Sequence, residues 1–381
     1  ILISVLGIVS LWMVAFSSSR SSYTNEGNTR EINRLDDVDT GGVARLNRQN
    51  GVKVNDKDTT RNSDGTFVEE DVFRKDLAFL EDPLNQMKDS DLPLFWHVPR
   101  TGGSTVKSIV GVCFGFTQAS ELGVSMGHNA DTELAVFEID GVKYINVDTT
   151  TIEGINRART FDLASNSTVD MVFSSYLSEA SSLYNADHKG RAFTILRHPI
   201  DRAISMFHYL VSNPQLNPII ADMTLTEYAE STHIENNWMV RYLANQMEGE
   251  LGKDQLEAAK EVLRRKIFIG LVDEFEESME QFTNYFNWWA KVEDEEKSER
   301  RMDCVSQLVS VGIGVNYGEK PSLEKGDQAW ALITWQNQYD IKLYEYASEE
   351  LFPMQSLQWG TKAKKKQIKK QKKALQKKTS L

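Results

Sequence analysis

Residues 97–105, HVPRTGGST, combine an arginine, two glycines and three hydroxyl side chains in one short segment. The segment follows an apolar run, and the residues after it, VKSIVGVCF, predict a helix. Glycines let a ligand approach the backbone closely, and the N–H groups at a helix start attract anions. We therefore predict a phosphate-binding loop, with a purely structural strand-to-helix turn as the alternative. Its residues are Arg100, Thr101, Gly102, Gly103, Ser104 and Thr105.

A second segment with anion-binding character is FTILRHPIDRAIS, residues 193–205. Arg197 closes an apolar run that predicts a strand, Pro199 marks a helix start, and Ser205 falls farther along that helix. A guanidinium binds phosphate bidentately, and the serine can add a hydroxyl. The alternative is a surface ion pair between Arg197 and Asp201. Two such strand ends predict a ligand with two phosphate groups, bound at the carboxyl ends of a parallel sheet.

The elements that must hold these segments alternate between strand and helix, which predicts an α/β fold with a parallel sheet flanked by helices. Strands are expected at 92–98, 169–176, 191–197 and 267–275, and Asp140-Gly141 predicts a hairpin within 134–149. Capping boxes predict helix starts at Thr224 with Glu227 and at Asp254 with Glu257. Long amphipathic helices are expected over 276–289 and 327–351.

The two ends of the chain have compositions that predict no part in this fold. Residues 1–16 are uncharged and mostly apolar, and since the chain begins without Met we expect further residues before them; a signal-anchor is favoured over a cleaved signal peptide. Residues 17–91 are polar and poor in aromatics, which predicts a disordered stem. The globular domain then spans 92–360, and 361–381 form a lysine-rich tail.

Charge and cysteine content exclude several functions. The tail holds ten lysines and no acid, so the rest of the chain is even more acidic than the formal net charge of −12 indicates. An acidic body does not suit general nucleic-acid binding, which depends on phosphate neutralisation. The only cysteines, Cys113 and Cys304, are compatible with one disulfide or with two buried thiols. They are too few for a cysteine-based metal centre.

The order of these motifs resembles the Golgi carbohydrate sulfotransferases related to heparan sulfate 2-O- and 6-O-sulfotransferases. HVPRTGGST is similar to that family's 5′-phosphosulfate loop and ILRHPIDRAIS to its 3′-phosphate site. Residues 258–288 and 337–347 resemble two later family segments. The resemblance extends from about residue 94 to 352.

This resemblance implies a P-loop-like α/β fold that binds 3′-phosphoadenosine 5′-phosphosulfate (PAPS) and needs no metal. It implies sulfuryl transfer to a hydroxyl of a carbohydrate or polysaccharide acceptor by a single-pass type II Golgi membrane protein with a lumenal domain. Residues 100–105 would hold the 5′-phosphosulfate, and Arg197 and Ser205 would hold the 3′-phosphate. A glycosylation acceptor at Asn166, in NST, fits that location.

Two positions depart from the family pattern. Arg100 replaces the usual lysine, so this side chain stabilises the leaving phosphate by charge and retains its proton. The family's histidine base is absent from VFSSYLSEASSLY (172–184), where Glu179 is the residue that could take the acceptor proton. The alternatives are a PAPS- or glycan-binding pseudoenzyme and, less well supported because the Walker lysine is missing, a P-loop kinase.

Overall fold

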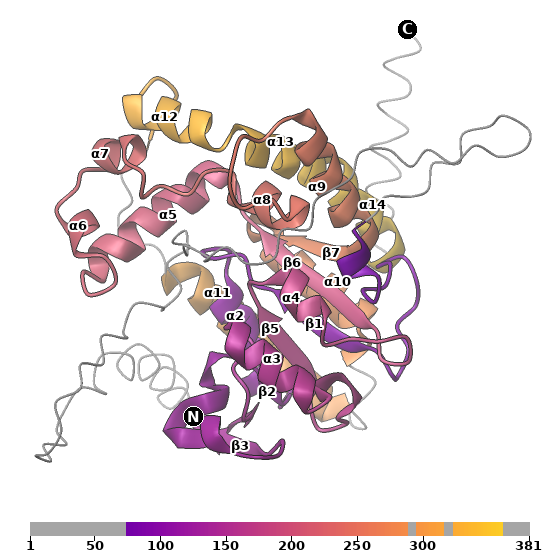
Figure 1. Cartoon of the computed structure of the whole chain (residues 1–381). Helices are drawn as coiled ribbons and strands as arrows, with labels where there is room; N and C mark the ends of the chain where they lie inside the picture. The colour runs from indigo at the N-terminus through magenta and orange to yellow at the C-terminus, as the bar shows by residue number, and fades with distance from the viewer. Residues whose placement is uncertain (1–73, 289–294, 316–322, 361–381) are drawn as a thin grey trace, which may run out of the picture.

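The computed structural model describes residues 74–288, 295–315 and 323–360. At its centre lies a seven-stranded sheet with the order β3-β4-β2-β5-β1-β6-β7, seen in Figure 1. All neighbouring strands are parallel except the β3–β4 hairpin. The strands are β1 (Leu92–Trp96), β2 (Gln118–Ala119), β3 (Val136–Ile139), β4 (Val142–Ile145), β5 (Met171–Ser174), β6 (Gly190–Leu196) and β7 (Ile267–Leu271).

Side chains alternate between two hydrophobic cores, one on each face of the sheet. In β1, Leu94 and Trp96 face one core and Phe95 faces the other; β6 and β7 alternate in the same way. Because every residue of β1, β5, β6 and β7 is buried, these strands are mostly apolar in sequence. This burial explains why the sequence located the central strands, although the strand expected over 267–275 ends at Leu271 and a 3-10 turn follows it (Val272–Glu274).

Helices cover both faces of the sheet (Figure 1). The first core packs against α3 (Ile152–Thr160), α4 (Leu177–Ser181), α8 (Trp238–Ala244), α9 (Lys253–Lys266), α13 (Gln338–Tyr346) and α14 (Phe352–Trp359). The second packs against α2 (Gly103–Ser108), its π-helical continuation (Ile109–Cys113), α10 (Phe275–Tyr285) and α11 (Glu295–Val315). A third cluster joins α5 (Pro199–Ser212), α6 (Pro218–Ala221), α7 (Leu225–Glu230) and α12 (Gln328–Gln336).

Several local expectations are confirmed. Asp140 and Gly141 both have positive φ, 49° and 81°, at the turn of the β3–β4 hairpin. The capping box of Thr224 and Glu227 starts α7, and Pro199 is the first residue of α5. Cys113 and Cys304 form a disulfide, which decides between the two alternatives left by the sequence.

Two helix predictions differ in detail from the structure. The helix expected after Asp254 is present, but its N-cap is Gly252 instead of Asp254, and the side chain of Gln255 accepts the N–H of Gly252. The single helix expected over 327–351 is divided after Gln336 into α12, α13 and a π-helical turn at 347–351.

The division after Gln336 lets two helix starts cap each other. The side chain of Asn237 accepts the N–H groups of Tyr339 and Asp340 at the start of α13, at 2.7 and 3.1 Å. In return, Asp340 accepts the N–H groups of Met239 and Val240 at the start of α8. Both asparagine and aspartate are buried, so only tertiary contact brings these caps together.

The segment 74–91, assigned by sequence to the stem, packs against the domain. Leu77 and Leu80 are buried, and Leu80 forms a parallel bridge with Gly190 at the start of β6. A Cβ at Gly190 would lie 2.5 Å from Leu80 and 2.8 Å from Tyr184, so only glycine allows this approach. Residues 74–91 therefore belong to the domain and not to the expected stem, because two of their leucines are buried and Asp91 forms a buried ion pair. Residues 1–73, with the expected anchor, and residues 361–381 lie outside the described part of the chain.

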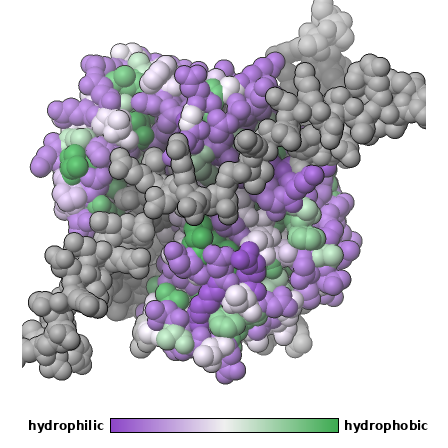
Figure 2. All heavy atoms as spheres, in the orientation of Figure 1, coloured by the Kyte–Doolittle hydropathy of each residue, from purple (hydrophilic) through white to green (hydrophobic). Residues whose placement is uncertain are grey.

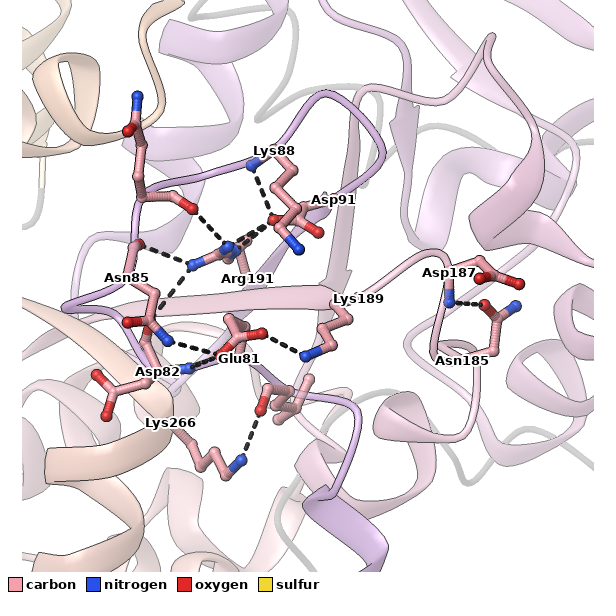
Figure 3. A network of polar contacts seen from close by, with 12 residues as sticks. Glu81, Asp82, Asn85, Lys88, Asp91, Asn185, Asp187, Lys189, Arg191 and Lys266 are labelled. Atoms are coloured by element: carbon pink, nitrogen blue, oxygen red, sulfur yellow. Dashed lines mark hydrogen bonds and ion pairs between the residues drawn. The ribbon is translucent and has the colours of Figure 1, made fainter.

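The buried ion pair joins Arg191 on β6 to Asp91, with nitrogen–oxygen distances of 2.6 and 2.7 Å (Figure 3). The guanidinium also donates to the carbonyl oxygens of Asp82, Asn85 and Gln86 and lies 3.0 Å from the hydroxyl of Tyr285. The side chain is 1% exposed, so each donor needs a protein acceptor. Arg191 therefore fastens the segment 82–91 to the amino end of the sheet.

The surface is mainly hydrophilic on the face drawn in Figure 2, with hydrophobic residues in small separate patches. Exposed apolar side chains such as Ile219 and Trp335 belong to different helices, α6 and α12. Among the described residues, no helix has the length and apolarity that crossing a membrane requires.

We predict that Arg191→Met lowers the free energy of unfolding by about 3–5 kcal/mol, because it leaves the Asp91 carboxylate buried without its counter-charge. Urea unfolding followed by tryptophan fluorescence measures the change. Arg264→Met is the matched control, since Arg264 on α9 is 43% exposed and should change stability by no more than about 0.5 kcal/mol. Equal effects of the two substitutions would show that the buried network does not stabilise the domain.

Candidate active site

Six parallel strands end at one edge of the sheet, and polar residues follow them there. In sheet order these are Asp148 after β4, Glu121 after β2, Ser175 after β5, His97 after β1, Arg197 after β6 and Asp273 after β7. Ligands of open parallel sheets bind outside this edge. Both anion-binding segments predicted from the sequence lie here.

The predicted phosphate loop connects β1 to α2 in a conformation that restricts its residues. Arg100 has φ of 67°, where a non-glycine residue is strained, and Gly102 has φ of 88°. A Cβ at Gly102 would also lie 2.8 Å from the ring of Phe275. Glycine is therefore required at this position for both backbone conformation and space.

Within the loop, the hydroxyls have different roles. Thr101 is fully buried, and its hydroxyl donates to the carbonyl of Val98 at 2.8 Å, so this side chain stabilises the turn instead of facing a ligand. Ser104 is exposed and Thr105 half-buried, which leaves both accessible as the sequence predicts. Gly103 begins α2, and the N–H of Thr105 already donates to the carbonyl of Gly102 at 3.0 Å. The N–H groups of Gly103 and Ser104 are therefore the ones that lack acceptors within the helix.

The second predicted segment meets this loop through its arginine and serine. Arg197 donates to the carbonyl of Arg100 at 3.4 Å, and Nε of Arg100 lies 3.3 Å from the hydroxyl of Ser205. The guanidinium of Arg100 also lies over the ring of Tyr209, 4.5 Å from its centroid. Ser205 is 2% exposed, so its hydroxyl contacts Arg100 instead of solvent.

The electrostatics of this meeting point favour an anion. Burial lowers the pKa of Arg100, and the positive charge of Arg197 lowers it further, against an opposing effect of Tyr209. A guanidinium nevertheless remains charged at physiological pH. Two converging like charges beside the N–H groups at the start of α2 suit an anionic ligand such as a phosphate group, because a bound anion would relieve their repulsion.

Glu179, expected from sequence to act as base, lies on α4 with its side chain exposed. The serines before it are also engaged: Ser174 is buried, and the hydroxyl of Ser175 donates to the carbonyl of His97 at 2.7 Å. The structure therefore does not support Glu179 as a buried base.

The sequence missed a charged cluster beside the loop. Lys107 on α2 forms an ion pair with Glu121, directly after β2. Burial acts to raise the pKa of Glu121, but the charge and hydrogen bond of Lys107 lower it overall. Burial raises the pKa of Asp148, hydrogen bonds from Thr150 oppose this, and the charge of Glu121 adds to the rise. No sequence signal marks Glu121, because β2 before it has only two residues and is not predicted.

His97 links this cluster to the loop. A Cβ at Gly103 would lie 2.4 Å from Cδ2 and Nε2 of the His97 ring, so the ring packs directly on the loop backbone. Burial and the charge of Lys107 lower the pKa of His97 to about 3, with Glu121 opposing and Arg100 adding to the fall. The imidazole is therefore neutral near pH 7 and acts as a packing group under the loop.

We predict that this neutral histidine makes the domain less stable in acid. The folded-state pKa of about 3 lies below the ordinary value of 6.5, so the unfolded chain binds the proton more readily. The stability contributed is fully present above pH 6.5 and is lost as pH falls towards 3. Between pH 7 and 5, wild type should lose at most about 2 kcal/mol more than His97→Gln in urea unfolding. Parallel curves for the two proteins would contradict this.

Comparison with known proteins adds to this geometry. A family model described as "Sulfotransferase family" matches residues 86–347. Among solved structures, the chain is similar to the crystal structure of mouse sulfotransferase SULT7A1 complexed with PAP, at 13% identity and a TM-score of 0.35, covering 80% of this chain and 100% of that one. No curated protein sequence matches the chain significantly.

The family model spans more than half of the chain and includes the loop, Arg197 and the charged cluster. Membership of this family supports the transfer of a sulfuryl group from PAPS as the chemistry of the site. The chain, with its parallel sheet and its anion-binding strand ends, belongs to the sulfotransferase family.

Proposed function

We propose that this protein transfers a sulfuryl group from PAPS to a hydroxyl of a carbohydrate or polysaccharide, as a relative of the heparan sulfate 2-O- and 6-O-sulfotransferases. The observation that carries the proposal is the meeting of Arg100 and Arg197 beside the glycine loop. It supports a ligand with two anionic groups, one at the loop and one at the start of α5. The acceptor class comes from the resemblance of the motifs in their order along the chain.

The residues of the site divide the work of binding. Gly103 and Ser104 offer helix-start N–H groups to the 5′-phosphosulfate, and Ser104 and Thr105 offer hydroxyls. Arg100 lies beside them. Arg197 holds the 3′-phosphate from the end of β6. The hydroxyl of Ser205 contacts Nε of Arg100, so Ser205 acts on the ligand through Arg100.

PAPS supplies the sulfuryl group when bound. Arg100 stabilises the negative charge that develops on the leaving phosphate and keeps its own proton, because the pKa of a guanidinium stays far above neutral. The strained loop is fixed by Phe275 and by the hydroxyl of Thr101, so its N–H groups need little reorganisation during the reaction. Positioning and charge stabilisation account for most of the catalysis in transfers of this kind.

A second candidate is a PAPS- or glycan-binding protein without transferase activity. The exposure of Glu179 and the engagement of Ser174 and Ser175 favour it, because no buried base follows β5 in the position where the resembling family has its histidine. Sulfate transfer from labelled PAPS to desulfated heparan sulfate and to chondroitin separates the two functions.

We further propose a type II orientation in the Golgi membrane, with the domain in the lumen. The apolar residues 1–16 support an anchor. The Cys113–Cys304 disulfide supports an oxidising compartment, and Asn166 lies on a turn whose neighbours Ser167 and Thr168 are exposed. Each is a separate argument for the lumen.

We predict that Arg197→Ala weakens PAP binding by about 1.5–3 kcal/mol, the cost of losing a charged hydrogen bond. Isothermal titration calorimetry should show a Kd raised roughly 10–150-fold. Arg264→Ala, on the exposed face of α9, should leave the Kd unchanged. Equal affinities of wild type and Arg197→Ala would remove Arg197 from the site.

We predict that the protein expressed in animal cells stays in the membrane pellet after carbonate extraction and carries an N-glycan on Asn166. Digestion with an N-glycosidase should shift wild type on a gel and leave Asn166→Gln unshifted. Soluble protein starting near residues 17–22 would show a cleaved signal peptide, and an unglycosylated, carbonate-extracted chain would oppose the lumenal assignment.

A further inference from the structure

The charged cluster joins the loop helix to the neighbouring strand end. Lys107 is four residues beyond Gly103 on α2, and its ammonium contacts the carboxylate of Glu121 after β2. The lysine is nearly buried, with its ammonium 5.4 Å from the ring centroid of Phe173 and its backbone carbonyl bonded to Gln118. The glutamate side chain remains 35% exposed. The nearly buried ammonium of Lys107 thus holds the partly exposed carboxylate of Glu121 beside the predicted PAPS site.

A second carboxylate is brought towards the same place by the chain after β4. The hydroxyl of Thr149 lies 2.8 Å from the carbonyl oxygens of both Ala119 on β2 and Phe173 on β5. This contact directs the chain after β4 across β2, towards β1 and the loop. Asp148, one residue earlier, is near enough for Glu121 and Lys107 to shift its pKa.

Buried hydroxyls accompany these charges. Ser120 and Tyr144 are each 1% exposed, and within the described part of the chain their hydroxyl oxygens have no hydrogen-bond partner. Tyr144 lies within electrostatic reach of Glu121, because that carboxylate contributes, after burial, to raising the tyrosine pKa. Buried polar atoms without partners are uncommon in folded proteins.

We propose that Glu121 is the general base of the transfer and that Lys107, Glu121 and Asp148 form the subsite for the acceptor hydroxyl; this rests on the function proposed above. The acceptor oxygen forms a bond to the sulfur of PAPS as the bond from sulfur to the 5′-phosphate oxygen breaks. The electron pair of that bond leaves with PAP. The proton of the acceptor hydroxyl passes to the Glu121 carboxylate, which later releases it to solvent.

Glu121 is preferred over its neighbours for geometric reasons. It alone among the acids of the cluster contacts a residue of the loop helix directly. One oxygen of Asp148 accepts both the N–H and the hydroxyl of Thr150, at 2.9 and 2.6 Å, which orients this side chain as a partner for substrate hydroxyls. His97 is packed under Gly103, and Glu179 is exposed on α4. Lys107 is a positioning residue, because it acts through Glu121.

The ionised state of Glu121 suits this role. Its ion pair keeps it deprotonated near neutral pH, so every molecule carries the base in its active form. A carboxylate of low pKa is a weak base towards a free alcohol. It becomes adequate as the bond to sulfur forms and makes the hydroxyl proton acidic.

The test compares Glu121→Gln with Glu257→Gln, the same substitution on a glutamate of α9 whose side chain is 55% exposed. Transfer from sulfur-35-labelled PAPS to desulfated heparan sulfate and to chondroitin is measured, together with PAP affinity by calorimetry and the melting temperature. We expect kcat of Glu121→Gln to fall about 10²–10⁴-fold with PAP affinity unchanged, and Glu257→Gln to match wild type. Glu121→Ala should recover part of its rate with added formate, which a purely structural glutamate would not do.

The outcomes separate this inference from the proposed function. If Glu121→Gln transfers sulfate at the wild-type rate, or if formate does not raise the rate of Glu121→Ala, the base assignment is wrong and the transferase remains. If wild type binds PAP and transfers nothing to either polysaccharide, the inference fails and the binding protein is the correct alternative. If wild type does not bind PAP, the proposed function itself fails.

Discussion

Burial of the parallel sheet on both faces is the constraint on which the site depends. The residues of β1, β5, β6 and β7 are all covered, so charged side chains that must meet a ligand are confined to the strand ends. Because six strands run in the same direction, their carboxyl ends form one continuous edge. The opposite edge has a structural role, with Arg191 holding the segment 82–91 to β6. The residues that meet a ligand and the residues that attach segment 82–91 therefore lie at opposite ends of the strands.

Charge is also divided along the carboxyl edge. Arg100 and Arg197 lie on the side of β1 and β6, whereas Glu121 and Asp148 follow β2 and β4. The helix that begins in the loop carries Lys107 between the two groups. The proposed anionic donor and hydroxyl acceptor would therefore meet different sides of one loop, which suits an in-line transfer between them. The disulfide from Cys113 to α11 fixes the far end of the same helical segment.

Features set by near neighbours in the chain could be predicted from the sequence, whereas features set by distant residues could not. The loop at 97–105 and the hairpin turn at Asp140-Gly141 are defined by glycine and by backbone conformation, so they could be recognised locally. The helix over 327–351 was not divided in the prediction, because its amphipathic pattern continues through the break. The break is stabilised by Asn237, about a hundred residues away in the chain. The predicted stem wrongly includes residues 74–91 for a similar reason. Asp91 is a polar residue in the sequence, and only the folded chain pairs it with Arg191.

The fold class was predictable from the sequence alone, and so were the glycine loop and the two arginines at the strand ends, because apolar runs, glycines and strand-terminal cations are local signals. Glu179 was selected by its distance along the chain from β5, but the exposure of a side chain depends on packing, and Glu179 is exposed. Lys107 and Glu121 are ordinary surface-type residues fourteen positions apart, and no local pattern joins them. Only the sheet order, which places β2 beside β5 and close to the loop helix, brings these opposite charges together in a partly desolvated site.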